Sequence, residues 1–242
     1  MRNSDRPDVG RGGLLELLDR YPVCFGLLGA NVVLFLFALS RAGGGFAVPP
    51  EVLYHLGGNV YPEVIREPWR LLTSAFLHAD VIHILFNSFA LLAVGRVLEV
   101  QLGSARLWVI YVLAAVGGSV CSAGWQAVSD RAAVSVGASG GAFGLIFLGW
   151  VYASRVPERL GSFAAGLRSW LFTIAIFSLL FFRELDHAAH AGGAAVGALF
   201  GRQLDTRPGR DLHPAWAFLA HGLALLALAS FAAVVLRLRG RA

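Results

Sequence analysis

Ser139 and His190 are two residues of this chain that could form a nucleophile and its base. Each lies near the start of an apolar run, about fifty residues apart in the sequence. Reactive polar side chains are costly inside membrane helices, so their presence there predicts a function. A serine becomes an effective nucleophile only when a base lies within hydrogen-bond reach, and histidine is suited to that task.

His83 and Asn87 could complete such a site. They are four positions apart and therefore share one face of a helix. Both side chains can donate hydrogen bonds to an oxyanion, as can the backbone amides at the start of the run that contains Ser139. Gly137 and Gly140, on either side of Ser139, permit a tight entry into that run and a close approach to its backbone.

Each of these residues also has a purely structural interpretation. A serine between glycines usually mediates packing between membrane helices, and an asparagine can join two helices by a hydrogen bond. A histidine near a helix end is more often a residue of the membrane interface. The functional interpretation therefore depends on whether the fold brings the four polar residues together.

The composition predicts an all-α polytopic membrane protein. Of the 242 residues, 57% are hydrophobic and 14% are charged, whereas soluble domains carry about a quarter charged residues. The net charge of +5 comes entirely from arginine, because the chain contains no lysine. In a membrane protein such arginines set the orientation of the loops. We therefore expect the lipid bilayer, and not nucleic acid, as a partner.

Seven apolar segments are candidates for membrane-spanning helices, for which a bilayer requires roughly 20 residues. The fourth and sixth are rich in glycine and poor in large side chains, which favours a central position among other helices. The segments are residues 22–40, 81–100, 106–128, 139–155, 167–183, 187–204 and 215–236.

These segments divide the chain into three parts. Residues 1–21 form a short N-terminal arm, and residues 22–204 form a core of six transmembrane helices. A long first loop within the core, residues 41–80, mixes glycine and proline with apolar patches, which suits a structure in the membrane interface. Residues 205–242 contain a linker, a seventh transmembrane helix and a basic tail.

The distribution of arginine predicts the orientation. Twelve arginines lie on the same side of the predicted spans as the N-terminal arm and five on the other, so the N-terminus should be cytoplasmic. The tail disagrees with this orientation, because a seventh span would place Arg237, Arg239 and Arg241 outside. Either this tail is tolerated there, or the last segment does not cross. The composition, rich in Arg, Ala and Gly, favours a bacterial inner (plasma) membrane.

The order of the spans brings the polar residues to one side of the membrane. The second, fourth and sixth spans run in the same direction, and each carries its polar residues near its start. His83, Asn87, Ser139 and His190 should therefore lie at a similar shallow depth, which water from the outer face can reach. This convergence favours the functional interpretation over the structural one.

Four stretches form a more specific pattern. They are Trp69-Arg70-Leu71-Leu72-Thr73, FLHADVIHILFNSFALLAVGRVLE around His83, VGASGGAFGL around Ser139 and DHAAHAGGAAVGALFG around His190. In this order, from Trp69 to Gly201, they resemble the rhomboid family of intramembrane serine proteases. The resemblance implies a rhomboid-like six-helix core, to which the apolar segment 215–236 adds a seventh, C-terminal transmembrane helix.

The resemblance also implies roles for individual residues. Ser139 would be the nucleophile and His190 the general base, in a dyad that requires no acidic third member. Asn87 and His83 would join the backbone amide of Ser139 in the oxyanion hole.

Supporting positions are implied in the same way. His78 matches a supporting histidine at the top of the second span, and Phe143 matches an aromatic residue that stacks on the catalytic histidine. Trp69 and Arg70 match a motif that anchors the first loop in the membrane interface.

Glycines in the sixth span have a packing role in this interpretation. Gly193, Gly197 and Gly201 form a seam that would let the sixth span press against the fourth and set the distance within the dyad. Asp186, one turn before His190, could suggest a catalytic triad. We expect it instead to be the N-cap of the sixth span.

The implied reaction is hydrolysis of a peptide bond in or near a transmembrane segment of a membrane-protein substrate. It proceeds through an acyl-enzyme and requires no metal and no cofactor. The alternative is a catalytically inactive rhomboid-like protein that binds or moves membrane clients, although such proteins typically lose the serine or the histidine. A zinc protease would need His-Glu-x-x-His, which is absent. A transporter would carry an inverted repeat and polar residues near the midplane. The sequence shows no such repeat, and its polar residues are expected at a shallow depth.

Overall fold

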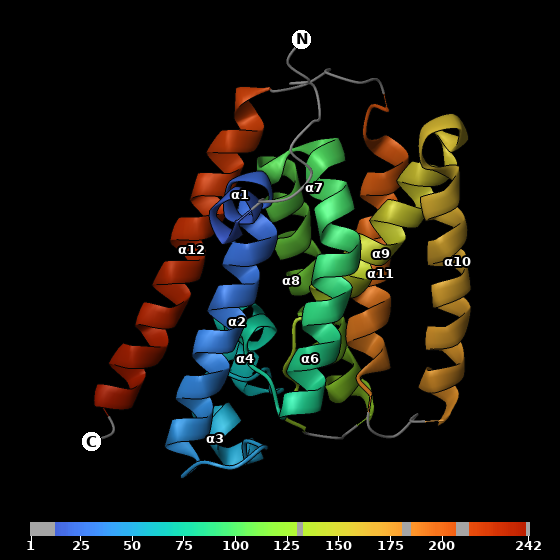
Figure 1. The fold of residues 1–242 in the computed structure, drawn as a ribbon. Helices are drawn as coiled ribbons and strands as arrows, with labels where there is room; N and C mark the ends of the chain where they lie inside the picture. Colours follow the sequence, from blue (N-terminus) through green and yellow to red (C-terminus); the bar gives the residue numbers. More distant parts are fainter. Residues whose placement is uncertain (1–12, 130–132, 181–184, 207–212, 241–242) are drawn as a thin grey trace.

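The chain folds into a bundle of helices (Figure 1). The computed structural model describes residues 13–129, 133–180, 185–206 and 213–240. Within these ranges every regular element is a helix, and extended backbone pairs only at two isolated bridges. The elements are α1 (Leu14–Arg20), α2 (Pro22–Arg41), α3 (Pro50–His55), α4 (Glu63–Arg66), α5 (Arg70–Thr73), the 3-10 turn η1 (Ser74–Phe76), α6 (Val81–Ala90), the π-helical turn η2 (Leu91–Gly95), α7 (Arg96–Leu102), α8 (Ser104–Ser129), α9 (Ser139–Ser154), α10 (Pro157–Leu180), α11 (His187–Gln203) and α12 (Pro214–Arg239).

Four helices of the described residues are long and apolar enough to cross a membrane. They are α2, the continuous helix Val81–Leu102 formed by α6, η2 and α7, then α8 and α12, while α9 is a shorter apolar helix. The prediction of an all-α polytopic membrane protein is confirmed. α12 covers the predicted seventh segment, and its passage through the membrane stays a prediction.

Six of the seven predicted segments begin within two residues of the start of an observed helix. The prediction for the fifth, 167–183, is wrong at its start, because α10 begins at Pro157. Proline is favoured in the first turn of a helix, but Glu158 and Arg159, which follow it, interrupt the apolar pattern that defined the segment. The predicted end of this segment, the first twelve residues of the arm and most of the linker before α12 lie outside the described residues.

α9 and α11 form the centre of the bundle and touch backbone to backbone. A Cβ atom added to Gly193 would overlap the carbonyl oxygen of Gly140, and one added to Gly197 would overlap that of Gly144. Because only glycine permits such an approach, the seam predicted for the sixth span is present, and it presses α11 against α9.

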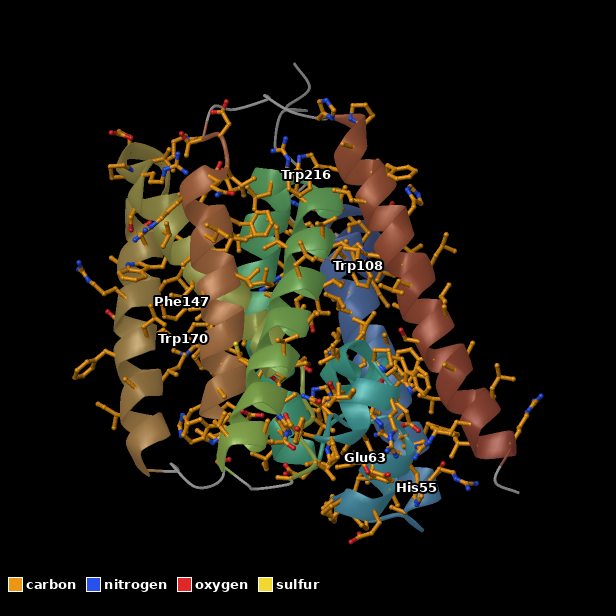
Figure 2. All side chains as sticks on the ribbon, turned by 180° about the vertical axis from the view of Figure 1, so that it is seen from behind. His55, Glu63, Trp108, Phe147, Trp170 and Trp216 are labelled. Carbon is orange, nitrogen blue, oxygen red and sulfur yellow. The ribbon has the colours of Figure 1, made fainter. Side chains whose placement is uncertain are left out.

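α10 and α12 lie at opposite edges of the bundle (Figures 1 and 2). α10 packs on α9, where Phe163 and Leu167 lie close to Gly149. α12 packs on α8, and the indole of Trp108 donates to the carbonyl of Ala220 at 3.1 Å. The central helices are therefore covered on both sides.

The long first loop is a folded unit organised around Arg70. This buried guanidinium donates to the carbonyl oxygens of Tyr54 (2.9 Å) and Gly58 (2.6 Å) and to the carboxylate of Glu67 (2.7 Å). The ring of Tyr54 lies 4.6 Å from Cζ of Arg70. One arginine thus joins three separate points of the loop.

Glu99 joins three helices at the end of the bundle opposite this loop. Its buried carboxylate accepts the backbone N–H groups of Val23 (2.8 Å) and Cys24 (3.1 Å) at the start of α2. It also accepts the hydroxyl of Ser104 (2.8 Å) at the start of α8. Helix N-termini carry partial positive charge, so one carboxylate of α7 holds two helix starts in place.

Candidate active site

Ser139 is the first residue of α9 and follows a sharp turn. Gly137 has a φ of 130°, a conformation that favours glycine, and its N–H donates to the carbonyl of Ser74 at 2.9 Å. The first backbone amides of a helix have no acceptor within that helix, and the helix dipole adds positive charge there. The turn therefore presents the hydroxyl together with free hydrogen-bond donors.

His190 lies within hydrogen-bond reach of Ser139. Its Nε2 is 3.1 Å from the Oγ of Ser139, although the two residues are 51 positions apart in the sequence. Phe143, one turn after Ser139 on α9, stacks on the imidazole with ring centroids 4.1 Å apart and planes inclined by 7°. The stacking and the contact between α9 and α11 together hold the imidazole in one orientation.

His83 reaches the same site from α6. Its ring lies against Gly137, where an added Cβ atom would be 2.6 Å from Nε2 of His83 and 3.7 Å from Oγ of Ser139. Asp80 fixes the start of α6 by accepting the backbone N–H of His83 at 2.8 Å. The ring of His83 and the hydroxyl of Ser139 thus both lie beside Gly137.

Asn87 lies one turn further along α6 and is buried. Its amide donates to the carbonyl of His83 at 3.0 Å. A side-chain amide nitrogen carries two protons, so a second one is available to another acceptor. Among the described residues no hydrogen bond joins Asn87 to Ser139. The assignment of Asn87 to an oxyanion hole stays a prediction.

His78 is fully buried and packs edge-on against His83, with ring centroids 5.2 Å apart and an angle of 69°. Burial lowers the pKa of His78 to about 3, because a charged imidazole would lose its hydration there. His78 is therefore uncharged at neutral pH and supports the ring of His83 by packing.

Trp69 and Arg70 belong to the folded loop rather than to this cluster. Trp69 is the N-cap residue of α5 and is partly buried. The guanidinium of Arg70 binds within the loop, as described above. The structure therefore brings Ser139, His190 and His83 together and leaves these two residues in the surrounding scaffold.

Asp186 caps α11 and forms no hydrogen bond with Nδ1 of His190. Its carboxylate accepts the backbone N–H of Ala189 (2.9 Å) and the hydroxyls of Ser122 (2.5 Å) and Ser135 (2.6 Å). Nδ1 of His190, where the acidic member of a triad would bind, has no hydrogen-bond partner among the described residues. The predicted N-cap is confirmed, while its two serine partners were not foreseen.

A polar stripe on α8 lies behind the dyad and was also missed. Ser119 lies 3.3 Å from the hydroxyl of Ser74, and Gln126 donates to Ser122 at 3.4 Å. Ser119, Ser122 and Gln126 are spaced by three and four residues, so they share one face of an otherwise apolar helix. That spacing is the signal that could have found them.

A small cavity lies between this stripe and Ser139. Its volume is about 20 Å³, and its lining includes the polar residues Ser74, Ser119, Ser135 and Asp186 together with Ser139. A polar cavity of this size holds about one water molecule.

Ser139 and His190 are within hydrogen-bond distance of each other inside a bundle of apolar helices. This arrangement is expected of a serine hydrolase built into a membrane. Comparison with known proteins shows the family of the chain. The Rhomboid domain matches residues 65–205, more than half of the chain. The chain belongs to the rhomboid family.

Individual relatives cover most of the bundle. RHOMBOID-like protein 2 of Arabidopsis thaliana is 35% identical over 185 residues, which are 72% of this chain and 55% of that protein. Rhomboid protease GlpG of Yersinia pestis (strain Pestoides F) is 29% identical over 166 residues, 68% of this chain and 56% of that protein. Rhomboid-like protease 1 of Toxoplasma gondii is 29% identical over 168 residues, 65% and 56% respectively. The chain spans about half the length of the curated relatives it matches.

These relatives also bear on the predicted location. The family and the apolar helices make the chain an integral, multi-pass membrane protein. The relatives include several plant proteins, one of them named as mitochondrial. The prediction of a bacterial inner membrane is therefore not supported.

Proposed function

We propose that the chain is an intramembrane serine endopeptidase that hydrolyses peptide bonds in or near transmembrane segments of membrane proteins. The 3.1 Å distance between Oγ of Ser139 and Nε2 of His190 carries the proposal. At this distance a base can take the proton of the nucleophile as it attacks. Two of the relatives are named as proteases, which supports the same reaction.

In the first step, Ser139 attacks the carbonyl carbon of the scissile bond and Nε2 of His190 takes the hydroxyl proton. A C–O bond forms, and the electron pair of the carbonyl double bond moves to oxygen. The backbone amides at the start of α9 would stabilise this oxyanion, together with the free amide proton of Asn87 and the ring of His83.

In the second step, the C–N bond breaks and His190 returns its proton to the leaving amine. The product is an ester between the substrate and Ser139. Water then attacks the ester with His190 again as base, which releases the acid and restores the hydroxyl. The cavity of about 20 Å³ beside Ser139 offers a place for that water.

A membrane-helix substrate would enter between α6 and α10. The two helices meet through Phe89 and Trp170, whose ring centroids are 5.7 Å apart at an angle of 87°. Figure 2 labels Trp170 beside Phe147 at this edge of the bundle. A ring pair of this kind contributes only about 0.5–1.5 kcal/mol beyond its buried area, so separating it is feasible. An opening here would expose α9 to a helix that arrives from the lipid.

We propose the membrane arrangement predicted from the sequence. The N-terminal arm to residue 21 is cytoplasmic, the core is 22–204, and 205–242 add a linker, a seventh span and a tail. The starts of α6, α9 and α11 at the end of the bundle opposite α1 support a dyad that faces the outer side (Figure 1).

Labelling of the detergent-solubilised protein with a fluorophosphonate probe tests the nucleophile. We expect the wild type to label and both Ser139→Ala and His190→Ala to lose labelling. Ser154→Ala is the matched control, because it removes an exposed serine from the far end of α9. Cleavage of a transmembrane substrate in liposomes should follow the same pattern.

Two results would contradict the proposal. Equal labelling of Ser139→Ala and wild type would place the reactive serine elsewhere. A folded wild type that neither labels nor cleaves would favour the alternative, an inactive rhomboid-like protein that binds membrane clients.

A further inference from the structure

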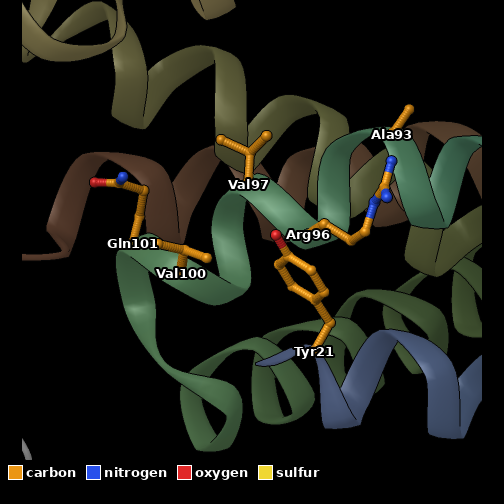
Figure 3. Close-up of a pocket in the computed structure, with 6 residues that line it drawn as sticks. All are labelled: Tyr21, Ala93, Arg96, Val97, Val100 and Gln101. Atoms are coloured by element: carbon orange, nitrogen blue, oxygen red, sulfur yellow. The ribbon is translucent and has the colours of Figure 1, made fainter. Parts of the chain in front are cut away.

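A second pocket lies beside α7, at the end of the bundle opposite the start of α6 (Figure 1), and Figure 3 shows the residues that line it. The pocket lies near the end of the helix Val81–Leu102. His83 lies near the start of the same helix, a helix length away. Its volume is about 410 Å³, within the range of about 300–1,000 Å³ that is usual for small-molecule sites. The lining residues are Tyr21, Ala93, Arg96, Val97, Val100 and Gln101.

Arg96 gives this pocket a positive charge that forms no ion pair within the described residues. Its Nε donates to the carbonyl of Leu92 at 2.8 Å. Within the described residues its two terminal nitrogens have no hydrogen-bond partner, and Cζ lies 5.9 Å from the ring centroid of Tyr21. The planar face of a guanidinium can rest on an aromatic ring while its N–H groups remain free to bind an anion.

The surrounding charges favour an anion as well. Arg20 lies over the same ring of Tyr21, with Cζ 5.5 Å from its centroid. Among the described residues the lining contains no carboxylate. Glu99 is buried and accepts three hydrogen bonds, as described above, and Glu16 and Asp19 of α1 are outside the lining. The amide of Gln101 supplies a further donor at the rim.

Exposed apolar side chains lie next to the pocket. α1 exposes Leu14 (66%) and Leu15 (77%) beside charged residues, which is typical of a short helix lying in the membrane interface. Val100, at the edge of the pocket, is 54% exposed. An apolar surface therefore begins where the basic pocket ends, as a ligand with a charged head and acyl chains requires.

We propose that this pocket binds the phosphate headgroup of an anionic glycerophospholipid from the membrane leaflet that surrounds α1. Arg96 would bind the phosphate through its two terminal nitrogens, with Arg20 adding charge and Gln101 bonding the headgroup. The acyl chains would lie along Val97 and Val100. The site would tie α1 and α7 to the membrane surface, and it does not depend on the proposed peptidase activity.

Native mass spectrometry of the full chain tests this site, using phosphatidylglycerol and phosphatidylcholine as probes. From an equal mixture, we expect the wild type to retain one phosphatidylglycerol in preference to phosphatidylcholine. Arg96→Gln should lower that retention at least fivefold. Arg202→Gln is the matched control, because it removes an exposed arginine near the end of α11, outside the pocket lining.

A second variant guards against a folding defect in the first. Gln101→Glu keeps Arg96 but places a carboxylate in the lining, so it should lower phosphatidylglycerol retention as well. Equal retention of the two lipids by wild type would overturn the proposal, as would unchanged retention in both pocket variants. Displacement of the bound lipid by millimolar inorganic phosphate would show a free-phosphate site and overturn the assignment to a lipid.

Discussion

The guanidinium of Arg237, near the end of α12, lies 2.7 Å from the carboxylate of Glu67 in the long first loop. Glu67 also accepts from Arg70, the residue that organises that loop. Cζ of Arg237 lies 5.3 Å from the ring centroid of Tyr54, which Arg70 also contacts. Arg237, one of the three arginines that disagreed with the predicted orientation, thus has a partner in the loop.

This ion pair predicts a stabilising role for the end of α12. Both side chains are largely buried, with 9% of Arg237 and 17% of Glu67 exposed, so solvent screens the pair weakly. Arg237→Gln should lower the free energy of unfolding by about 1–3 kcal/mol, measured by SDS titration of the purified protein. Arg239→Gln, which changes an exposed arginine two residues away, should have little effect. If the two variants lowered the free energy of unfolding equally, the ion pair would not be the cause.

The contact between α9 and α11 predicts that bulk at Gly197 lowers activity without changing the chemistry. An added methyl group would overlap the carbonyl oxygen of Gly144 and push the two helices apart. Since a displacement of about 1 Å can cost about 100-fold in rate, Gly197→Ala should reduce cleavage at least about 10-fold. Gly124→Ala on α8 is the control, because nothing lies within 4 Å of its added methyl group. Full activity in Gly197→Ala would show that the seam does not set the distance within the dyad.

The hydrogen bonds of Asp186 distinguish a cap from a member of a triad. Asparagine is also a good N-cap residue, so Asp186→Asn should keep cleavage within about 10-fold of wild type. In a serine protease triad the same exchange costs about 10,000-fold. Asp186→Ala should lower the free energy of unfolding by about 1–2 kcal/mol through loss of the cap. Comparing cleavage rates with unfolding in SDS separates the two roles.

Burial of His78 predicts a dependence of stability on pH. The unfolded chain binds a proton at this residue near pH 6.5, whereas the folded protein, with a pKa of about 3, does not. The stability linked to His78 is therefore complete above pH 6.5 and is lost as the pH falls toward 3. Between pH 7 and pH 5, wild type should lose about 2 kcal/mol more than His78→Phe. Parallel losses in SDS unfolding would show that His78 is protonated in the folded protein.

The ring pair between α6 and α10 predicts a variant with increased activity. Trp170→Ala removes the contact with Phe89, worth about 0.5–1.5 kcal/mol, and should raise cleavage of a transmembrane substrate about 2- to 10-fold. Phe172→Ala, on the same helix, changes a ring that is 70% exposed and should leave the rate unchanged. A lower rate for Trp170→Ala would argue against entry at this place.

The helices around the dyad could be predicted because their starts are encoded in short segments. Asp80 and Asp186 cap α6 and α11 from the position directly before each helix, and glycine at position 137 permits the turn before α9. The apolar lengths then gave the spans, and the order of the spans placed Ser139 and His190 at one end of the bundle. The helix starts follow from neighbouring residues, and the position of the two residues follows from the number of membrane spans between them.

Contacts between distant segments could not be predicted in this way. Ser122 is polar within an apolar helix, which indicates that it has a partner, but that partner, Asp186, is 64 residues away. The pairing of Arg237 with Glu67 depends on where α12 packs, which apolar length alone does not determine. The start of α10 was missed because a proline followed by charged residues is as typical of a loop as of a helix start.

The glycine contacts between α9 and α11 make the helices that carry Ser139 and His190 one packed unit. No side chain lies between the two backbones at Gly193 and Gly197, so no change of rotamer there can alter their spacing. The movement that admits a substrate must then be made by helices outside this pair. In the proposed enzyme the site would be assembled before the substrate arrives, and turnover would be limited by how often the bundle opens.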